Sequence, residues 1–196
     1  MTRIMRDAIN PNNIPLEGSQ LFAGYDNGRI SQWPTDAWKR FPGGSTVHID
    51  VDGTNFTSDV IDVEAGNSTV SNNYALTVGW VKAKQGHSFL PICYANRSTL
   101  TPMFNALNAA GFYVGKHFLL WIATLDGTKT VSDMTGVVAV QYTDHSDLYD
   151  ESVVYWDSWK APVTPPVIEE TGYLIMPSAT PRVFVVHSQD GGKTWQ

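Results

Sequence analysis

The chain has 196 residues, a 42% share of hydrophobic residues and a formal net charge of −6. This length and apolar content suit one main domain with a sizeable core and a short appendage. The negative charge and the lack of clustered Lys and Arg argue against nucleic acid as a partner. No apolar run approaches the roughly 20 residues that a membrane-spanning helix needs.

Aromatic residues are prominent, and charged residues are few. Aromatics make up 12% of the chain, with seven Trp and eight Tyr, whereas charged residues make up 16%. This composition favours sugar-like or peptide-like ligands over highly charged ones. The single cysteine, Cys93, excludes an internal disulfide framework, and its place in an apolar segment predicts a buried and unreactive thiol.

Eight short apolar segments are bounded by Gly, Asn, Asp and Pro. Each has the length of a strand and is rich in β-branched or aromatic residues. Several are almost continuously hydrophobic, which is typical of strands buried on both faces of a parallel sheet. The predicted strands cover residues 4–8, 21–25, 46–51, 60–63, 89–94, 118–123, 137–142 and 153–156.

Helical segments lie between some of these strands. A helix beginning after Thr69 or Ser71 as N-cap is expected to end at 85–86. A second is expected to begin with Thr101 as cap and Pro102 in its first turn, and to end at Gly111. Residues 33–41 are expected to form a shorter one.

The alternation of strands and helices predicts an α/β fold built from βαβ units. We expect a TIM-like (β/α)8 barrel over residues 1–160. Its second half should have reduced helices, because the segments after the sixth and seventh strands are too short for full ones. A doubly wound open sheet is the competing architecture.

After residue 160 the composition changes. Residues 161–166 read Ala-Pro-Val-Thr-Pro-Pro, which is typical of a stiff extended linker. Two strands are expected at 173–176 and 182–187. Residues 188–195 resemble the Asp-box turn of β-propeller proteins. We therefore predict that residues 161–196 form a Pro-rich linker and a β-hairpin tail.

Two acids stand at the end of the predicted fourth strand. Asp62 and Glu64 are two residues apart, so on a strand they point to the same side. Two neighbouring carboxylates oppose each other's ionisation, and one then holds a proton near neutral pH. A glycosidase needs this combination of a proton donor and an ionised partner. Alternatively, such an Asp caps the turn that follows the strand.

Other acids also lie near strand ends. If the sheet closes into a barrel, the ends of its parallel strands meet at one mouth. An acidic bowl then follows, although Asp also favours strand-to-helix turns, and we expect that simpler role for at least Asp26 or Asp126. A calcium or magnesium site made of these oxygens is a further alternative. The acids are Asp7, Asp26, Asp50, Asp52, Asp126 and Asp150.

The order of motifs resembles that of the family 25 glycoside hydrolases, the Chalaropsis-type lysozymes found among phage endolysins. Their pattern of an early Asp, an Asp-x-Glu and a closing Asp segment is similar to Asp7, Asp62 with Glu64, and Asp150 here. The runs Pro-Ile-Cys-Tyr-Ala-Asn at 91–96, Leu-Trp-Ile-Ala at 120–123 and Val-Gln-Tyr-Thr at 140–143 also resemble family strands. The resemblance spans roughly residues 1 to 157.

This resemblance implies cleavage of the β-1,4 bond between N-acetylmuramic acid and N-acetylglucosamine in peptidoglycan, without a cofactor. It implies Glu64 as general acid and Asp62 as nucleophile or charge stabiliser, with Asp7 and Asp150 in the same catalytic site. Sugar-binding residues would be Asp26, Asp50, Tyr94, Trp121, Gln141 and Tyr142, since aromatic faces stack on pyranoses while acids and amides bind hydroxyls.

Two strands depart from the family pattern. The third reads Val-His-Ile-Asp-Val-Asp at 47–52, and the first lacks the usual Asp-Val-Ser run after its Asp. These departures indicate a divergent branch of the family. The alternative to a muramidase is then a barrel on a virion or cell surface that binds glycan without cutting it. A metal-dependent hydrolase is a third hypothesis.

Other chemistries have weaker support. The five His residues show no ligand spacing for zinc, and no Gly-x-Ser-x-Gly motif supports a serine hydrolase. Residues 1–10 contain no signal-peptide-like stretch, so we expect a wall-acting protein to be released by phage lysis or carried on a virion. The oligomeric state is left open.

Overall fold

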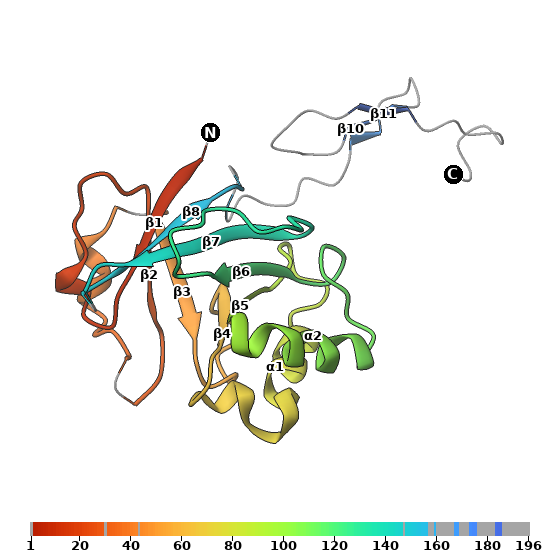
Figure 1. Cartoon of the computed structure of the whole chain (residues 1–196), viewed down its shortest axis with the longest axis horizontal. Helices are drawn as coiled ribbons and strands as arrows, with labels where there is room; N and C mark the ends of the chain where they lie inside the picture. The colour runs from red at the N-terminus through yellow and green to blue at the C-terminus, as the bar shows by residue number, and fades with distance from the viewer. Residues whose placement is uncertain are drawn as a thin grey trace.

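The computed structural model describes residues 2–29, 31–42, 44–146, 148–156 and 159, together with three short strands between 167 and 185. Eight strands hydrogen-bond in sequence order to form a closed barrel (Figure 1). The barrel confirms the predicted fold class over the open sheet. Its strands are β1 (Arg3–Asp7), β2 (Leu21–Tyr25), β3 (Thr46–Asp50), β4 (Val60–Val63), β5 (Ile92–Asn96), β6 (Leu119–Ala123), β7 (Val137–Asp144) and β8 (Asp150–Val154).

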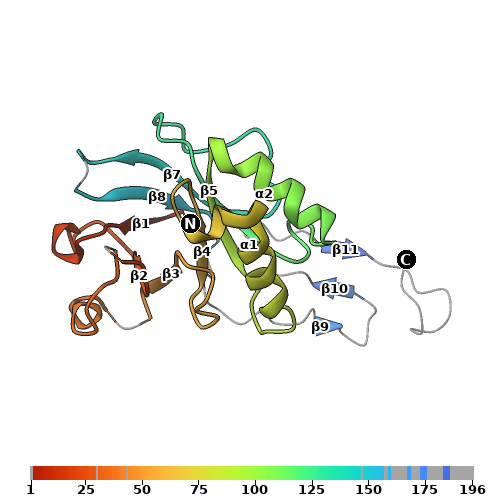
Figure 2. The same ribbon diagram turned by 90° about the horizontal axis from the view of Figure 1, so that it is seen from below.

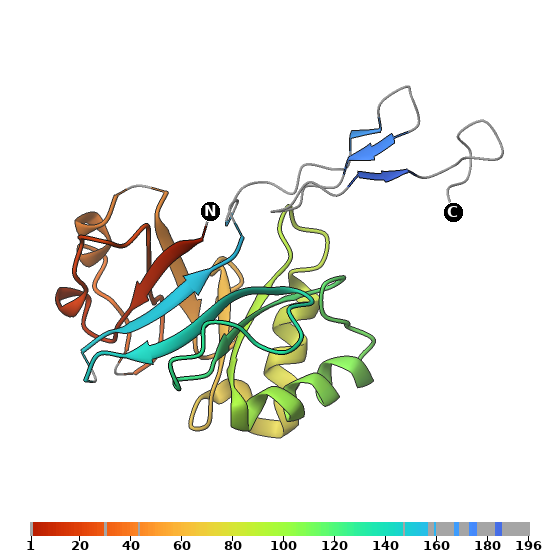
Figure 3. The same cartoon turned by 45° about the horizontal axis from the view of Figure 1, so that its top comes forward.

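The first seven strands are parallel, but β8 runs antiparallel to both of its neighbours, β7 and β1. Figure 3 shows these three strands side by side. The expectation that all strands are parallel is therefore wrong for the strand that closes the barrel. Because β8 is reversed, its first residue, Asp150, lies at the end of the barrel where the parallel strands finish.

Side chains alternate between the barrel interior and its outer surface, as the two-residue period of a strand requires. The interior is packed with residues such as Met5, Val47, Val60, Trp121 and Val154, each almost completely buried. This core fills the barrel, so the ligand-accessible region is confined to its ends.

Two α-helices cover the outer face of β4, β5 and β6. They are α1 (Ser71–Ala83) and α2 (Arg97–Ala109), and Figure 2 shows them side by side against this part of the barrel. Ile61, Val63 and Cys93 point outward from the strands into this helical layer. Burial raises the pKa of the Cys93 thiol, in agreement with the expected unreactive cysteine.

The predicted cap of the second helix, Thr101, was wrong by five residues. Asn96 caps α2, because its side-chain oxygen accepts hydrogen bonds from the backbone N–H groups of Ser98 and Thr99. Pro102 therefore lies inside the helix. The expected capping role of Thr69 is also wrong, since its hydroxyl donates to the backbone carbonyl of Asp62 at 2.6 Å.

In the described residues of the first two crossovers the only helical segments are short 3-10 turns, η1 (Pro11–Asn13) and η2 (Ala37–Arg40), and a third turn, η3 (Ser68–Val70), leads directly into α1. Helices are thus reduced in the first half of the barrel as well as in the second. An aromatic layer covers β1 and β2 instead. Phe41 stacks on both Phe22 and Trp33, at centroid distances of 4.7 Å and 5.3 Å, and the Trp33 indole donates to the Ala8 carbonyl.

Beyond the barrel, β9 (Val167–Ile168), β10 (Tyr173–Ile175) and β11 (Val183–Val185) form an antiparallel sheet. The strands β10 and β11 lie within the two predicted strand segments. The predicted linker at 161–166 and the turn at 188–195 fall outside the described residues, so the domain boundary stays a prediction. Among the residues described, no helix is long and apolar enough to cross a membrane.

Candidate active site

Four carboxylates converge at the end of the barrel where the parallel strands finish. Asp7 is the last residue of β1, Asp62 lies in β4, Glu64 follows β4 directly, and Asp150 opens the reversed β8. They interact electrostatically, since Asp150, Asp62 and Glu64 all raise the pKa of Asp7. The structure therefore brings together the four acids that were predicted to be catalytic, while their roles stay predictions.

Asp62 is buried, with 4% of its surface exposed. Burial raises its pKa well above the ordinary value, the charge of Glu64 raises it further, and a hydrogen bond with the Asn67 side chain opposes both effects. Asp62 is held in place through its backbone, because the Thr69 hydroxyl bonds its carbonyl oxygen. A carboxyl in this environment keeps its proton to a higher pH than an exposed one does.

Glu64 is more accessible than Asp62 and lies among hydrogen-bond donors. Its Oε1 accepts from the Tyr94 hydroxyl at 3.3 Å and from the Asn96 amide at 3.1 Å. Both donors come from β5, the strand that pairs with β4. The neighbouring strand therefore sets the orientation of the Glu64 carboxylate.

An aromatic and amide wall stands beside the acids. Tyr94 and Trp121 meet edge to face, with centroids 4.9 Å apart, and the Trp121 indole donates to the Ser152 hydroxyl at 2.9 Å. Gln141 is buried, and its Oε1 has no hydrogen-bond partner within the described part of the chain. These three predicted sugar-binding residues face the same interior as the acids.

Tyr25, at the end of β2, was missed by the sequence analysis. Burial raises the pKa of its hydroxyl, and so do the charges of Asp7, Asp62, Asp150 and Glu64. The signal that could have found it is the two-residue period of β2, because Leu21 and Ala23 point into the barrel and Tyr25 continues that series.

Tyr142 does not join the wall. Adjacent residues on a strand point to opposite sides, so Gln141 and Tyr142 cannot both face the interior. Tyr142 packs on the outer side of β7, where its hydroxyl bonds Glu151 and its ring lies under Lys129. The predicted placement of Tyr142 in the sugar-binding wall therefore needs correction.

Asp26 and Asp50 also lie apart from the four acids, on the outer side of the barrel wall. Asp26 accepts hydrogen bonds from Ser58 at 2.6 Å and Asn55 at 3.3 Å, and it pairs with His48 at 2.6 Å. Asp50 is completely buried and orders the loop after β3. Its carboxylate oxygens accept hydrogen bonds from the backbone N–H groups of residues 52, 53 and 55 and from the Asn27 side-chain amide. Asp50 is thus closed to a sugar, whereas the predicted sugar contact of Asp26 stays a prediction.

Asp126 lies after β6, is exposed, and forms an ion pair with Arg97. Hydrogen bonds with Thr128 and then the Arg97 guanidinium lower the pKa of its carboxyl. It therefore belongs to the surface and serves the simpler turn role that the sequence analysis allowed.

Buried acceptors at the mouth lack donors. One carboxylate oxygen of Asp7, one of Asp62 and the amide oxygen of Gln141 have no hydrogen-bond partner among the described residues. An unpaired buried acceptor costs about 1–3 kcal/mol, so these three atoms weaken the fold at the mouth. The described residues contain no group of three or more His, Cys, Asp or Glu side chains arranged to hold a metal ion.

Comparisons with known proteins give one similarity. No protein-family model matches the chain, and no curated protein does. A search of solved structures finds the structure of a family 25 glycosyl hydrolase from Bacillus anthracis, with 14% sequence identity and a TM-score of 0.48. The match covers 79% of this chain and 89% of the other.

Proposed function

We propose that this protein is a glycoside hydrolase that cleaves the β-1,4 bonds of peptidoglycan, as an N-acetylmuramidase. The observation that carries the proposal is the convergence of Asp7 with three carboxylates whose charges raise its pKa, at one end of a closed barrel beside Tyr94 and Trp121. The order of sequence motifs, which resembles family 25, supports the choice of substrate.

In the proposed reaction Glu64 donates a proton to the leaving oxygen of the glycosidic bond. Glu64 is the acid of the pair that is partly open to solvent, and its carboxylate is oriented by Tyr94 and Asn96. After bond cleavage its negative charge would be stabilised by these two donors. A positioned general acid of this kind contributes roughly 10²–10⁴-fold to the rate.

Asp62 is the proposed second carboxylate, acting as nucleophile or charge stabiliser. Burial is the main cause that raises the pKa of Asp62, and the charge of Glu64 raises it further. When Glu64 holds the proton, this contribution disappears and Asp62 ionises more readily. The positive charge that develops on the sugar favours ionisation further, so the two acids compete for one proton and take opposite roles.

The test is hydrolysis of purified peptidoglycan, followed as loss of turbidity and as new reducing ends identified after borohydride reduction. Wild-type protein should release reducing-end muramic acid. Glu64→Gln and Asp62→Asn should each lose at least about a hundredfold in rate, while Asp126→Asn, which removes an acid outside the cluster, should keep it. Hydrolysis that survives in Glu64→Gln would exclude its role as the acid.

A glycan-binding barrel without catalysis is the second candidate, and the deep burial of Asp62 favours it, because a reacting carboxyl must meet the substrate. Such a protein would sediment with cell walls and leave their turbidity unchanged. A metal-dependent hydrolase would instead lose its activity on chelation.

The setting we propose for peptidoglycan cleavage is the bacterial cell wall, reached by phage release or on a virion, and this rests on the motif resemblance alone.

A further inference from the structure

A cavity lies at the opposite end of the barrel from the four acids. It has a volume of about 460 Å³. Asp59 immediately precedes β4, and Ile92 opens β5, so both mark the start of strands whose other ends reach the acidic mouth. Trp156 and Trp159 follow β8, which runs in the reverse direction and finishes at this same end.

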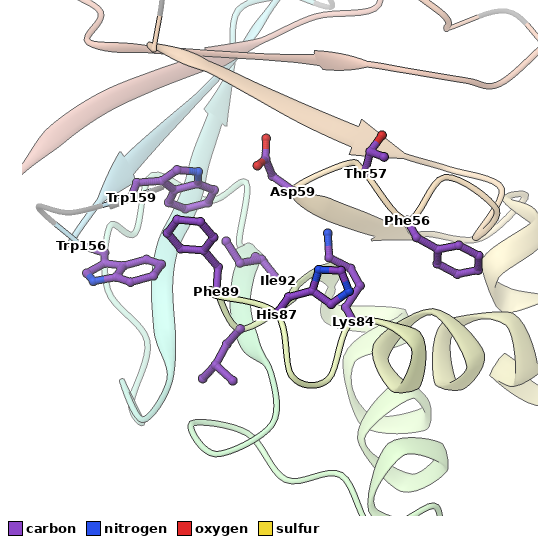
Figure 4. A pocket seen from close by; sticks show the side chains of 10 residues that line it. Phe56, Thr57, Asp59, Lys84, His87, Phe89, Ile92, Trp156 and Trp159 are labelled. Carbon is purple, nitrogen blue, oxygen red and sulfur yellow. The ribbon is translucent and has the colours of Figure 1, made fainter. Parts of the chain in front are cut away.

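The cavity has an aromatic part and a polar part. Figure 4 shows Trp156, Trp159 and Phe89 gathered beside Ile92, with Lys84 and His87 farther along the cavity. Its volume falls within the range of roughly 300–1,000 Å³ typical of small-molecule sites, which are mainly apolar with a few placed polar groups.

The Trp159 ring lines the aromatic part. Trp159 is 5% exposed, and its indole N–H has no hydrogen-bond partner among the described residues. Buried indole N–H groups usually find a partner, and an unpaired one costs about 1–3 kcal/mol. Because this nitrogen is buried, Trp159 offers the cavity its apolar ring and not its donor.

The polar part contains charges of both signs. The Lys84 ammonium is buried against Ser58 and lies 4.5 Å from the centroid of the Trp80 ring. Asp59 attracts this ammonium, and one of its oxygens accepts from the His48 backbone N–H. A ligand with a net charge of either sign would meet one repelling group. Hydroxyl groups, which both donate and accept hydrogen bonds, fit such a pair.

We propose that this cavity is a second saccharide site, in which a neutral sugar ring stacks on Trp156 and Phe89, contacts the ring of Trp159, and binds Asp59 and His87 through its hydroxyls. It would let the barrel hold a glycan away from the acidic mouth. The choice of a wall glycan as the natural ligand rests on the proposed function, whereas binding itself does not.

The experiment is a titration with the β-1,4-linked trimer of N-acetylglucosamine, followed by the indole N–H resonances in ¹H–¹⁵N spectra. The protein carries Glu64→Gln so that the trimer is not consumed, and Trp159→Phe assigns the Trp159 signal. The Trp159 resonance should move saturably. The Trp121 resonance reports separately on the acidic mouth, so failure of one site does not hide the other.

Two variants test the cavity. Trp156→Ala should weaken the Trp159 response about tenfold and leave the Trp121 response unchanged. His87→Ala, which changes an exposed side chain with little risk to folding, should weaken it several-fold. The proposal is overturned if the trimer leaves the Trp159 resonance unmoved, or if both variants respond like the parent. Benzoate, which has an aromatic ring and a charge but no hydroxyl groups, is the comparison ligand, and a resonance that moves with benzoate and not with the trimer also overturns the proposal.

Discussion

Asp7 and Asp150 stand directly opposite each other across the antiparallel pair of strands that closes the barrel. Like charges in this position destabilise a sheet. The pKa of Asp7 is raised well above the ordinary value, first by burial and then by the charge of Asp150. The cluster that we propose as the active site therefore weakens the fold that holds it, as functional sites often do.

Replacing Asp7 with Asn should stabilise the protein at neutral pH. Because its pKa is higher in the folded state than the ordinary 3.8, the unfolded chain loses this proton first as the pH rises. The stability contributed by Asp7 is therefore complete below about pH 3.8 and falls as the pH rises toward the folded pKa. Asp7→Asn should melt above wild type at about pH 7, by roughly 2–4 °C for each kcal/mol gained, and the difference should shrink toward about pH 4.

Asp126→Asn is the control, because its effect on stability should depend on pH in the opposite direction. The pKa of Asp126 is lowered, first by its hydrogen bonds with Thr128, so its contribution is present at neutral pH and is lost as the pH falls. Thermal unfolding between about pH 4 and pH 7 measures both variants. An Asp7→Asn protein that melts below wild type at neutral pH would contradict the repulsion inferred for the cluster.

Much of the barrel could be predicted because strand length, β-branched content and the two-residue period are all local. Asp62 in β4 and Glu64 directly after it face one side, and Ile61 and Val63 face the other, as their spacing requires. The direction of β8 could not be predicted, because an apolar run contains no information on which way a strand is paired. Its reversal explains why Asp150, at the start of a strand, meets acids at strand ends.

The errors at the site have local causes. Tyr142 follows Gln141 directly, and only one of two adjacent strand residues can face the interior. Asp50 looks like a site acid in sequence, but the loop after β3 needs its oxygens as acceptors for backbone N–H groups. Such loop contacts depend on three-dimensional closure and leave no periodic pattern in the sequence.

Gly24 in β2 should not tolerate a side chain. A Cβ at this position would lie 2.5 Å from ring atoms of Trp33, which is closer than side chains approach each other in folded proteins. Gly24→Ala should therefore displace the aromatic layer and cost about 1–3 kcal/mol of unfolding free energy. Denaturant unfolding and the near-ultraviolet circular dichroism of the tryptophans measure the change.

Gly79→Ala is the matched control for this substitution. Gly79 lies within α1, and a Cβ there would meet nothing within 4 Å. Alanine should stabilise the helix by about 0.5–1 kcal/mol. If Gly24→Ala and Gly79→Ala change the unfolding free energy equally, the close approach of Trp33 does not constrain β2.

Asn96 links the folding of α2 to the orientation of Glu64, because its two side-chain atoms have separate tasks. The oxygen accepts from the backbone N–H groups of Ser98 and Thr99, and the nitrogen donates to Glu64 at 3.1 Å. Asn96→Ser keeps a capping oxygen but is too short to reach Glu64, whereas Asn96→Ala removes both contacts. We expect Asn96→Ser to stay within about 0.5 kcal/mol of wild type in stability and Asn96→Ala to lose about 1 kcal/mol.

Activity should respond differently from stability in this pair. Both variants lose the donor to Glu64, so both should hydrolyse peptidoglycan on the order of tenfold more slowly. A hydrogen bond to a charged group is worth about 1.5–3 kcal/mol, and the expected loss lies at the lower end of this range. Reducing-end release measures the rate, and thermal unfolding measures the cap. If Asn96→Ser hydrolyses at the wild-type rate, the amide does not orient Glu64 for the reaction. If activity falls only in Asn96→Ala, the effect of Asn96 passes through the helix and not through the acid.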